Sequence, residues 1–234
     1  HVWSRADFPG EYVRNKLRGN RAAEERATER NRAGFRHFTA TGFEVRPGPA
    51  AVLAKLREAW ARGRLLAAKP EVVHPMNPHL SSYESDTWVL EPSAELRDET
   101  DRALRPLVAA WAGLEEEELL PPIVHGVRLY HNGSMMHFHS DKETSHALGV
   151  IIHVGHLTFN GSAHREWPLE LYDHEGARHL LPLDSDEEIL LYESVSCPHG
   201  RVGPFLGREF ANLFLHYRPK GWPDAYRVKH EQEL

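Results

Sequence analysis

The spacing of apolar residues predicts an amphipathic helix in the first half of the chain. Val52, Leu56 and Trp60 recur at every fourth position within residues 49–67, which places them on one face of a helix. Within the preceding residues 1–34, the stretch 11–33 has few large apolar side chains and interleaves arginine with glutamate, a pattern typical of a solvated helix with ion pairs between successive turns. We therefore predict a charged helical extension followed by a helix with one buried face.

A second helix is predicted for residues 93–112. Ser93 is a favourable N-cap residue, and the helix-breaking Pro106 is expected to kink or split the segment. Residues 70–92, between the two helices, contain several prolines and little periodicity, so we expect a long loop of the kind that often binds ligands. The face of the second helix that we expect to be buried comprises Leu96, Thr100, Ala103, Leu107 and Trp111.

After residue 121 the pattern changes to short apolar runs separated by glycine, asparagine, aspartate and proline. Such runs predict β-strands, and His174-Glu175-Gly176 between two of them predicts a hairpin turn. Strands that follow helices favour an α+β fold, here a two-sheet jelly roll (a double-stranded β-helix) supported by the N-terminal helices. The predicted strands are 123–131, 136–141, 147–154, 168–173, 178–183, 188–193 and 208–217.

The length of 234 residues fits one domain with an appendage. We expect the domain to span residues 35–234. Its parts would be helical support in 35–120, the jelly-roll core in 121–220 and a C-terminal tail in 221–234.

The composition excludes several classes of protein. Hydrophobic residues make up 41% of the chain, and no apolar run approaches the ~20 residues of a membrane-spanning helix. The net charge of −6 gives no support for nucleic-acid binding. A single cysteine, Cys197, excludes an intramolecular disulfide and is compatible with the cytoplasm, which we expect, and with the secretory pathway, which stays open because the chain begins at His1. The sequence leaves the oligomeric state open.

Seventeen histidines make metal chemistry the first function to consider. In His139-Ser140-Asp141, alternate residues of a strand share a face, so His139 and Asp141 can point at one ion. His199 follows a later strand and can supply a third ligand. Two imidazoles and one carboxylate leave coordination positions open, which suits a non-haem Fe(II) oxygenase and also zinc-dependent hydrolysis.

Two arginines are candidates for binding a carboxylate near such a metal. Arg208, nine residues after His199, is predicted to open the last strand, where a guanidinium suits a carboxylate co-substrate. The alternative is a surface arginine paired with Glu209 or another carboxylate. Arg201, two residues after His199, would point inward if the strand continues, and would meet a substrate carboxylate or the co-substrate. Its alternative is an inter-strand salt bridge.

These residues together resemble a known family. Tyr130, eight further residues, His139-x-Asp141, fifty-seven residues, His199 and then Arg208 on the last strand are similar to the Fe(II)- and 2-oxoglutarate-dependent dioxygenases, in particular to the prolyl 4-hydroxylase-like catalytic domain. The resemblance covers roughly residues 120–220. It implies hydroxylation of an unactivated C–H bond, with oxidative decarboxylation of 2-oxoglutarate to succinate and CO2. Fe(II), 2-oxoglutarate and O2 are the implied cofactors, and ascorbate is a possible addition.

The resemblance also implies roles for single residues. His139, Asp141 and His199 would bind Fe(II), and Arg208 would bind the distal carboxylate of 2-oxoglutarate. Tyr130 would line the co-substrate pocket. His153 stands roughly where related enzymes have a tyrosine that holds the same carboxylate, and a buried structural histidine is the alternative. Because related halogenases lack the carboxylate ligand, Asp141 favours hydroxylation or another oxidation.

Several alternatives remain open at this point. A three-histidine zinc site would use His137 with His139 and His199. A non-catalytic, metal-binding jelly roll is a second alternative. For an oxygenase, the substrate would be either a prolyl residue in a peptide or a small molecule, such as an amino-acid-like metabolite. Tyr83 and Trp88 in the predicted loop are candidate substrate contacts. We expect no nucleic-acid partner and no membrane segment in this chain.

Overall fold

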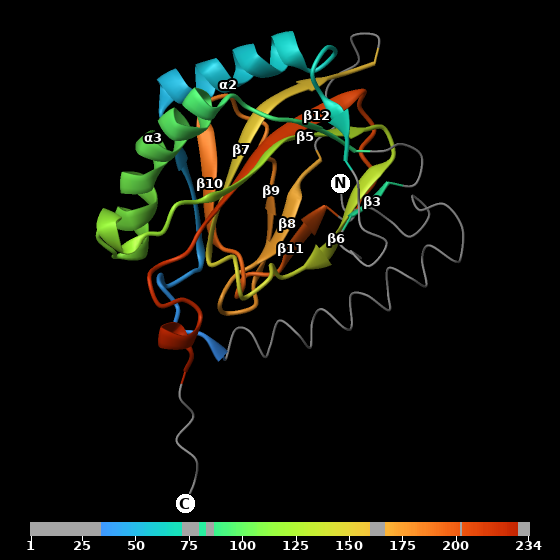
Figure 1. Ribbon diagram of the computed structural model, residues 1–234. Helices are drawn as coiled ribbons and strands as arrows, with labels where there is room; N and C mark the ends of the chain where they lie inside the picture. Colours follow the sequence, from blue (N-terminus) through green and yellow to red (C-terminus); the bar gives the residue numbers. More distant parts are fainter. Residues whose placement is uncertain (1–33, 72–79, 83–86, 160–166, 202, 229–234) are drawn as a thin grey trace, which may run out of the picture.

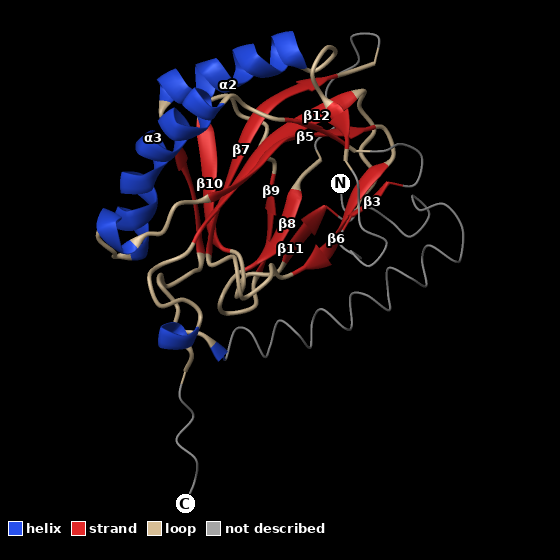
Figure 2. Cartoon of the chain, viewed as in Figure 1, coloured by secondary structure: helices blue, strands red, loops and turns tan. Residues whose placement is uncertain are grey.

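The computed structural model shows two antiparallel β-sheets that face each other, with two α-helices against the outer face of the larger sheet (Figures 1 and 2). The predicted α+β fold with a jelly-roll core is therefore confirmed. The predicted extension 1–34 lies almost wholly outside the described residues. The structure describes residues 34–71, 80–82, 87–159, 167–201 and 203–228.

The larger sheet separates two hydrophobic cores. On its strand β12, Leu213 and Leu215 pack toward the helices, whereas Phe210 and Phe214 face the smaller sheet, as expected when successive side chains alternate between faces. Its seven strands, in spatial order, are β1 (Phe43–Pro47), β10 (Glu188–Glu193), β7 (Leu148–Leu157), β12 (Glu209–Tyr217), β5 (Ile123–His131), β4 (Trp88–Leu90) and β2 (Lys69–Pro70).

The smaller sheet is built around a strand of three residues. The predicted hairpin turn at His174-Glu175-Gly176 joins its last two strands, and Gly176 supplies the positive φ of 84° that the turn requires. The five strands, in spatial order, are β3 (Leu80–Ser82), β6 (Ser134–His139), β11 (His199–Arg201), β8 (Leu169–Tyr172) and β9 (Arg178–Leu181).

The two α-helices cover the outer face of the larger sheet (Figure 1). Helix α2 (Ala50–Gly63) buries Val52, Leu53 and Leu56, while Trp60 is partly buried against the same core. Helix α3 (Ala94–Ala112) begins at the predicted cap, where the Ser93 side chain accepts a hydrogen bond from the N–H of Leu96. The described residues also contain two short 3-10 helices, at Glu116–Glu118 and Asp224–Tyr226.

Helix α3 differs from the prediction in two respects. Pro106 neither splits it nor ends it, because the turns on both sides of the proline are buried against the sheet, and this packing offsets the cost of about 3 kcal/mol for a proline inside a helix. The buried stripe is also shifted. Of the predicted face only Thr100 is fully buried, and the others are partly buried at its margin. The buried residues are Thr100, Leu104, Val108, Ala109 and Ala112.

The strand predictions are correct for the long runs and incomplete for the short ones. Strands β5 and β10 have the predicted bounds, and the other predicted runs match strands to within a few residues. The predicted loop 70–92 is wrong in part, since it contains β3, β4 and the end of β2. Strand β11 and strand β1 were not predicted at all. Short strands carry too few residues to show a period.

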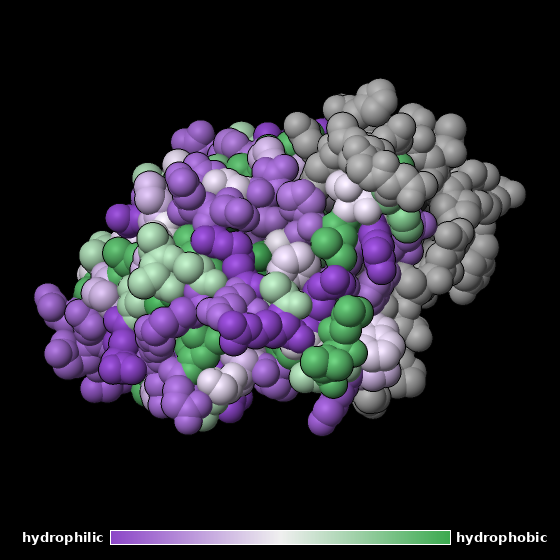
Figure 3. All heavy atoms as spheres, turned by 90° about the horizontal axis from the view of Figure 1, so that it is seen from above, coloured by the Kyte–Doolittle hydropathy of each residue, from purple (hydrophilic) through white to green (hydrophobic). Residues whose placement is uncertain are grey.

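One face of the molecule carries mostly polar side chains among its described residues. Figure 3, a view from above, shows hydrophilic residues over most of this face, with smaller hydrophobic areas between them. Leu65 and Leu66, just after α2, are the most exposed large apolar residues among those described, at 75% and 90%. Within the described residues, no helix combines the length and the apolar character that crossing a bilayer requires.

Candidate functional site

His139 and His199 lie opposite each other on neighbouring strands of the smaller sheet. His139 ends β6 and His199 begins β11, and the two residues are partners in the antiparallel register. Directly opposed residues point to the same face of a sheet, so the imidazole rings are adjacent, with centroids 4.6 Å apart. Both side chains are buried. The strand pairing therefore holds two potential metal ligands side by side.

Asp141 completes this group from the loop after β6. Its backbone N–H donates to the carbonyl oxygen of Ser194 at 2.9 Å, which fixes the loop against the end of β10. Its Oδ1 lies 3.5 Å from Nε2 of His139 and 4.0 Å from Nε2 of His199. One donor atom from each of the three residues lies within 4.8 Å of the others. The structure thus brings the three predicted ligands together, with Asp141 past the strand and not on it.

Hydrogen bonding and burial give these side chains the protonation states that metal binding requires. Nδ1 of His199 lies 3.0 Å from the carbonyl oxygen of Cys197, so it carries the proton and leaves the lone pair on Nε2. Burial, followed by the charge of His139, lowers the pKa of His199 to about 3. Burial alone would raise the pKa of Asp141, but the nearby histidines, His216 first, hold it well below its usual value. A neutral imidazole and an ionised carboxylate result at neutral pH.

Arg201 is a buried guanidinium two residues from His199. Its side chain, 1% exposed, lies over the rings of Trp167 and Phe210, with Cζ 4.7 and 4.8 Å from their centroids. It donates to the carbonyl oxygen of Trp167. With the Asn212 amide oriented so that its oxygen points toward Arg201, Nη2 also donates to that oxygen at 3.2 Å. Burial lowers the pKa of Arg201 to about 10, so the group is still charged at neutral pH.

Arg128 on β5 shows the difference that a carboxylate partner makes. Its Nε and Nη2 donate to the two carboxylate oxygens of Glu71 at 2.7 and 2.6 Å. Arg201, by contrast, forms no ion pair with any carboxylate of the described residues, so the predicted inter-strand salt bridge is not found there. An isolated buried charge is costly, and such groups are normally paired. Within the described residues Arg201 is therefore held by neutral acceptors and aromatic rings, and the charge of Asp184 acts on it without an ion pair.

Arg208 occupies a different environment from the one expected. It lies immediately before β12, which begins at Glu209, and its side chain is exposed. Its backbone N–H donates to the carbonyl oxygen of Leu157 at 2.8 Å. Arg208 therefore lies one residue before the strand that it was predicted to open, and its predicted role toward a carboxylate stays a prediction. Of the two candidate arginines, Arg201 is buried and Arg208 is exposed.

Tyr130 and His153 both face the space between the two sheets. Tyr130 on β5 is fully buried, and its ring meets that of Trp167 edge to face at 5.0 Å. His153 on β7 is buried next to Phe210, with ring centroids 4.7 Å apart, and its Nε2 lies 3.2 Å from Nδ1 of His156. Burial, followed by the charge of His156, lowers the pKa of His153 to about 3. His153 is thus a neutral residue at pH 7 in the aromatic surroundings of Arg201.

Tyr192 and His216 contact the group and were not predicted from the sequence. Nε2 of His216 lies 2.9 Å from Oδ2 of Asp141 and 3.3 Å from the hydroxyl of Tyr192. The Tyr192 ring packs edge to face on His199, with centroids 4.8 Å apart. Burial raises the pKa of Tyr192 well above its usual value, so the hydroxyl keeps its proton. The signal that could have identified His216 was a polar residue at an inward-facing position of β12, beside the apolar Phe210 and Phe214.

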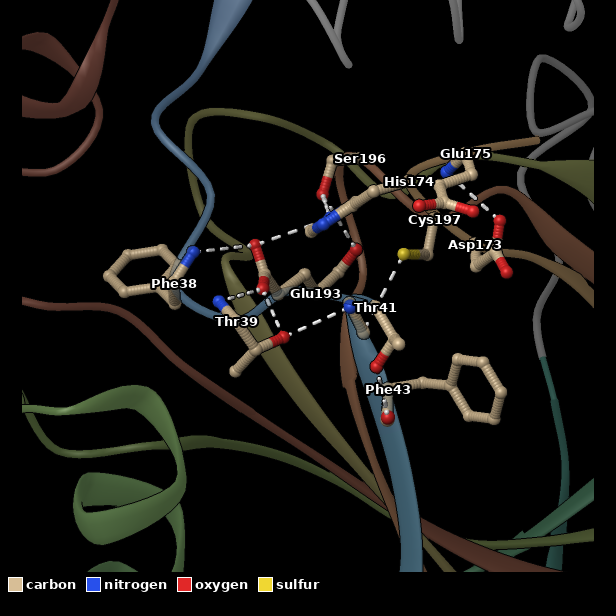
Figure 4. A network of polar contacts seen from close by, with 11 residues as sticks. Phe38, Thr39, Thr41, Phe43, Asp173, His174, Glu175, Glu193, Ser196 and Cys197 are labelled. Carbon is tan, nitrogen blue, oxygen red and sulfur yellow. Dashed lines mark hydrogen bonds and ion pairs between the residues drawn. The ribbon is translucent and has the colours of Figure 1, made fainter. Parts of the chain in front are cut away.

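A network around Glu193 ties the segment before β1 to the region of His199 (Figure 4). The buried Glu193 carboxylate accepts hydrogen bonds from the N–H of Phe38 at 3.1 Å and from the N–H and hydroxyl of Thr39, both at 2.8 Å. Nε2 of His174 lies 3.5 Å from the same carboxylate. Cys197, the predicted small core residue, is buried beside it, and its thiol donates to the carbonyl oxygen of Gly42.

Three further sequence predictions have different outcomes. Trp88 lies on β4 and is 38% exposed, so it remains available as a substrate contact. Tyr83 lies outside the described residues, and so does the side chain of His137. The three-histidine zinc site that uses His137 is therefore not tested.

Comparisons with known proteins show the fold. No family model and no curated protein sequence matches the chain. It is similar to a prolyl-4-hydroxylase from Pseudomonas putida (16% identity, TM-score 0.59, covering 84% of this chain and 98% of that one). A prolyl hydroxylase from Trichoplax adhaerens, in complex with a hypoxia inducible factor oxygen degradation domain peptide fragment, gives 12% identity and a TM-score of 0.54 over 92% of this chain and 96% of that one.

A third similar structure is an oxidoreductase of the 2OG-Fe(II) oxygenase family from Burkholderia pseudomallei, with 11% identity and a TM-score of 0.51 over 90% of this chain and 92% of that one. The chain therefore has the fold of the 2-oxoglutarate- and Fe(II)-dependent oxygenases, including the prolyl 4-hydroxylases. The likeness extends well beyond residues 120–220, since these alignments cover 84–92% of the chain.

Proposed function

We propose that this chain is an Fe(II)- and 2-oxoglutarate-dependent oxygenase that hydroxylates an unactivated C–H bond. The observation that carries the proposal is the pairing of two features on β11. His199 begins the strand as one of three converging metal ligands, and Arg201 ends it as a buried cation without a carboxylate partner among the described residues. The oxygenase fold supports the same conclusion. We further propose that residues 35–234 form one catalytic domain and that 1–34 extend from it.

His139, Asp141 and His199 would hold the iron. Their donors are two imidazoles and one ionised carboxylate, the set that suits Fe(II) with three positions left open. Neighbouring ligands of one ion with bonds of about 2.1 Å lie about 3 Å apart, so the present separations of 3.5 and 4.0 Å need only small side-chain rotations. His216 and Tyr192 contact the outer oxygen of Asp141 and the ring of His199, and would keep both ligands oriented.

Arg201 would bind the distal carboxylate of 2-oxoglutarate. Two residues along a strand span about 7 Å, and they point to the same face, so Arg201 lies at one co-substrate length from the ligand His199. The guanidinium is already desolvated between Trp167 and Phe210, and a carboxylate arriving there would neutralise it. Tyr130 and His153 would form further walls of this region, consistent with their burial beside the same aromatic rings.

Bound iron and 2-oxoglutarate supply the oxidising chemistry, in which O2 is consumed and 2-oxoglutarate is converted to succinate and CO2. The residues of this chain bind and orient the participants. Asp141 stays ionised at neutral pH and would bind the iron through its carboxylate. Arg201 fixes the far end of the co-substrate, and the apolar side chains of Trp167 and Phe210 exclude water from it.

For the substrate we propose a prolyl residue in a peptide. This rests on the fold, which is similar to a prolyl-4-hydroxylase and to a prolyl hydroxylase solved with a peptide fragment. The half-exposed Trp88 on β4 would offer an aromatic surface to such a chain. A small-molecule substrate is the alternative, and the experiment described next distinguishes it from a peptide substrate.

The test is succinate formation by the Fe(II)-loaded protein with 2-oxoglutarate and O2. One set of reactions contains proline-containing peptides and a second contains free amino acids and related metabolites. We expect succinate above the uncoupled background together with a product 16 Da heavier in the peptide set, and neither in the Asp141→Ala variant. A product only in the metabolite set contradicts the substrate proposal alone. Retention of tight zinc, with no succinate above the Asp141→Ala background in either set, contradicts the oxygenase proposal.

A further inference from the structure

A second group of histidines lies next to the proposed iron site. His125 comes from β5, His146 from the loop before β7, and His216 from β12. One ring nitrogen from each lies within 4.8 Å of the other two. His216 is buried, whereas His125 and His146 are partly exposed, so the group is accessible from solvent. Three strands or loops that are distant in sequence thus converge on one small volume.

The separation between His125 and His146 matches the spacing of two ligands on one ion. Their Nε2 atoms are 3.3 Å apart. Two nitrogens bound tetrahedrally to Zn2+ at 2.0–2.1 Å are also about 3.3 Å apart, by simple geometry. Nδ1 of His146 lies 2.7 Å from the hydroxyl of Ser145, an outer hydrogen bond of the kind that orients a ligating imidazole. The two Nε2 atoms can therefore share an ion without moving.

His216 connects this group to Asp141. Its Nε2 lies 2.9 Å from Oδ2 of Asp141, and the negative charge of the carboxylate favours a proton on that nitrogen. Its Nδ1 is buried, carries the lone pair and has no hydrogen-bond partner in the described structure. A carboxylate that fixes the tautomer of an imidazole, whose other nitrogen then binds a metal, is the usual arrangement around ligating histidines. The unpartnered Nδ1 is the atom that a metal ion would satisfy.

We propose that His125, His146 and His216 form a second metal site, separate from the proposed iron site, for a divalent transition-metal ion such as Zn2+ or Co2+. Three imidazoles select this class of ion over Mg2+ or Ca2+, and a water molecule would complete the tetrahedron. The site does not depend on the oxygenase reaction. Its link through His216 means that the ion would help to hold Asp141 in place for the first metal.

The test is a titration of the full chain, stripped of metal with a chelator, with Co2+ followed by visible absorbance and calorimetry. We expect two tightly bound equivalents in the natural protein. The His125→Gln/His146→Gln variant is expected to lose one of them and the absorption band of a tetrahedral ion. The His139→Ala/His199→Ala variant is expected to keep that band and lose the other equivalent. His179→Gln, on β9 and paired with Asp173, is the matched control and should keep both.

Circular dichroism checks that each variant is folded, and the single His146→Gln change provides a milder variant should the double change unfold the chain. Co2+ should also raise the unfolding temperature of the His139→Ala/His199→Ala variant, because an ion that binds only the folded state stabilises it. One equivalent in the natural protein overturns the proposal. A His125→Gln/His146→Gln variant that still binds two equivalents of Co2+ also overturns the proposal. Loss of the second site with normal succinate formation leaves the oxygenase proposal intact, so the two proposals can fail separately.

Discussion

His139 and His199 are register partners across β6 and β11, and this one pairing creates the centre of the candidate site. Two imidazoles are brought to 4.6 Å by backbone hydrogen bonds, before any metal contributes. Asp141 then needs only the short loop past β6 to reach both rings. The site is therefore preorganised by the smaller sheet, and changes that disturb this sheet or the residues packed on it should affect metal binding directly.

Replacing Arg201 with methionine should separate ligand binding from stability. An unpaired buried cation contributes little to folding and its removal is often neutral or stabilising, so the unfolding temperature should stay the same or rise. Loss of a buried partner of a carboxylate costs about 3 kcal/mol, so 2-oxoglutarate should bind about 100-fold more weakly. Thermal unfolding and calorimetric titration measure the two effects.

Arg208→Met is the matched control for this change, since Arg208 is exposed. It should alter 2-oxoglutarate affinity less than about threefold. A large loss of affinity in Arg208→Met with none in Arg201→Met would reverse the assignment of the two arginines.

Gly149→Ala should disturb the iron site through Tyr192. A Cβ at residue 149 would lie 2.9 Å from the Tyr192 hydroxyl and would overlap its ring, which packs on His199. We expect a loss of about 1–3 kcal/mol in stability from overpacking and a roughly 10-fold weaker affinity for Fe(II). Gly34→Ala is the control, because a Cβ there meets nothing within 4 Å. Unchanged iron affinity in a folded Gly149→Ala protein would contradict this role for Tyr192.

Replacing Glu193 should lower the stability, because its buried carboxylate accepts several hydrogen bonds. The Glu193→Ala change leaves the N–H groups of Phe38 and Thr39 without their acceptor, which we expect to cost about 3 kcal/mol. Thr39→Val removes both hydrogen bonds of the hydroxyl, which donates to Glu193 and accepts from the N–H of Gly42, and should cost about 2 kcal/mol. Urea unfolding measures both. A loss below about 0.5 kcal/mol in Glu193→Ala would mean that the network of Figure 4 contributes little.

The metal-free protein should lose stability as the pH falls from 7 toward 4. Burial lowers the pKa of His199 and His153 to about 3 and that of His125 and His146 to about 4, against an ordinary value of 6.5 for histidine. Between these values the unfolded chain binds protons that the folded chain does not, so the free energy of unfolding rises with pH in this window. The limit is about 1.4 kcal/mol per pH unit for each group.

Glu193 acts in the opposite sense, because burial raises its pKa and the folded chain then holds a proton that the unfolded chain has released. The four histidines outweigh it. Urea unfolding at a series of pH values gives the slope of the unfolding free energy against pH. His153→Leu should reduce this slope by up to the amount that corresponds to one bound proton. A stability that does not change between pH 7 and 4.5 would show that these imidazoles are not neutral and buried in solution.

Much of the architecture could be predicted from the sequence because the long strands have clear boundaries. Strands β5 and β10 are bounded by turn residues and matched their predicted ranges. The start of helix α3 was predicted correctly from its cap, but its buried face is shifted from the predicted one. The spacing of apolar residues is compatible with more than one buried face, and packing on the sheet selects one of them. Strand β11 has three residues, and only its pairing with β6 and β8 defines it.

The candidate metal ligands could be predicted because His139 and Asp141 are two residues apart and His199 comes shortly after a predicted strand. Arg201 was predicted to point inward by the same reasoning, since residues two apart on a strand share a face, and it is buried. The exposure of Arg208 could not be predicted, because the sequence does not show how the residues before β12 are packed. The contact between Asp141 and His216 depends on the order of strands in two sheets, and no local pattern contains that information.

The most direct test of the oxygenase proposal is an anaerobic titration of the metal-free protein with Fe(II) and 2-oxoglutarate, followed by visible absorbance. We expect a weak charge-transfer band that appears only when both are present. In Asp141→Asn, which keeps the shape of the side chain but not its charge, iron affinity should fall by more than about 100-fold, since even outer contacts of metal ligands contribute 10- to 100-fold. No band in the natural protein at saturating Fe(II) and 2-oxoglutarate, or an undiminished band in Asp141→Asn, would contradict the account.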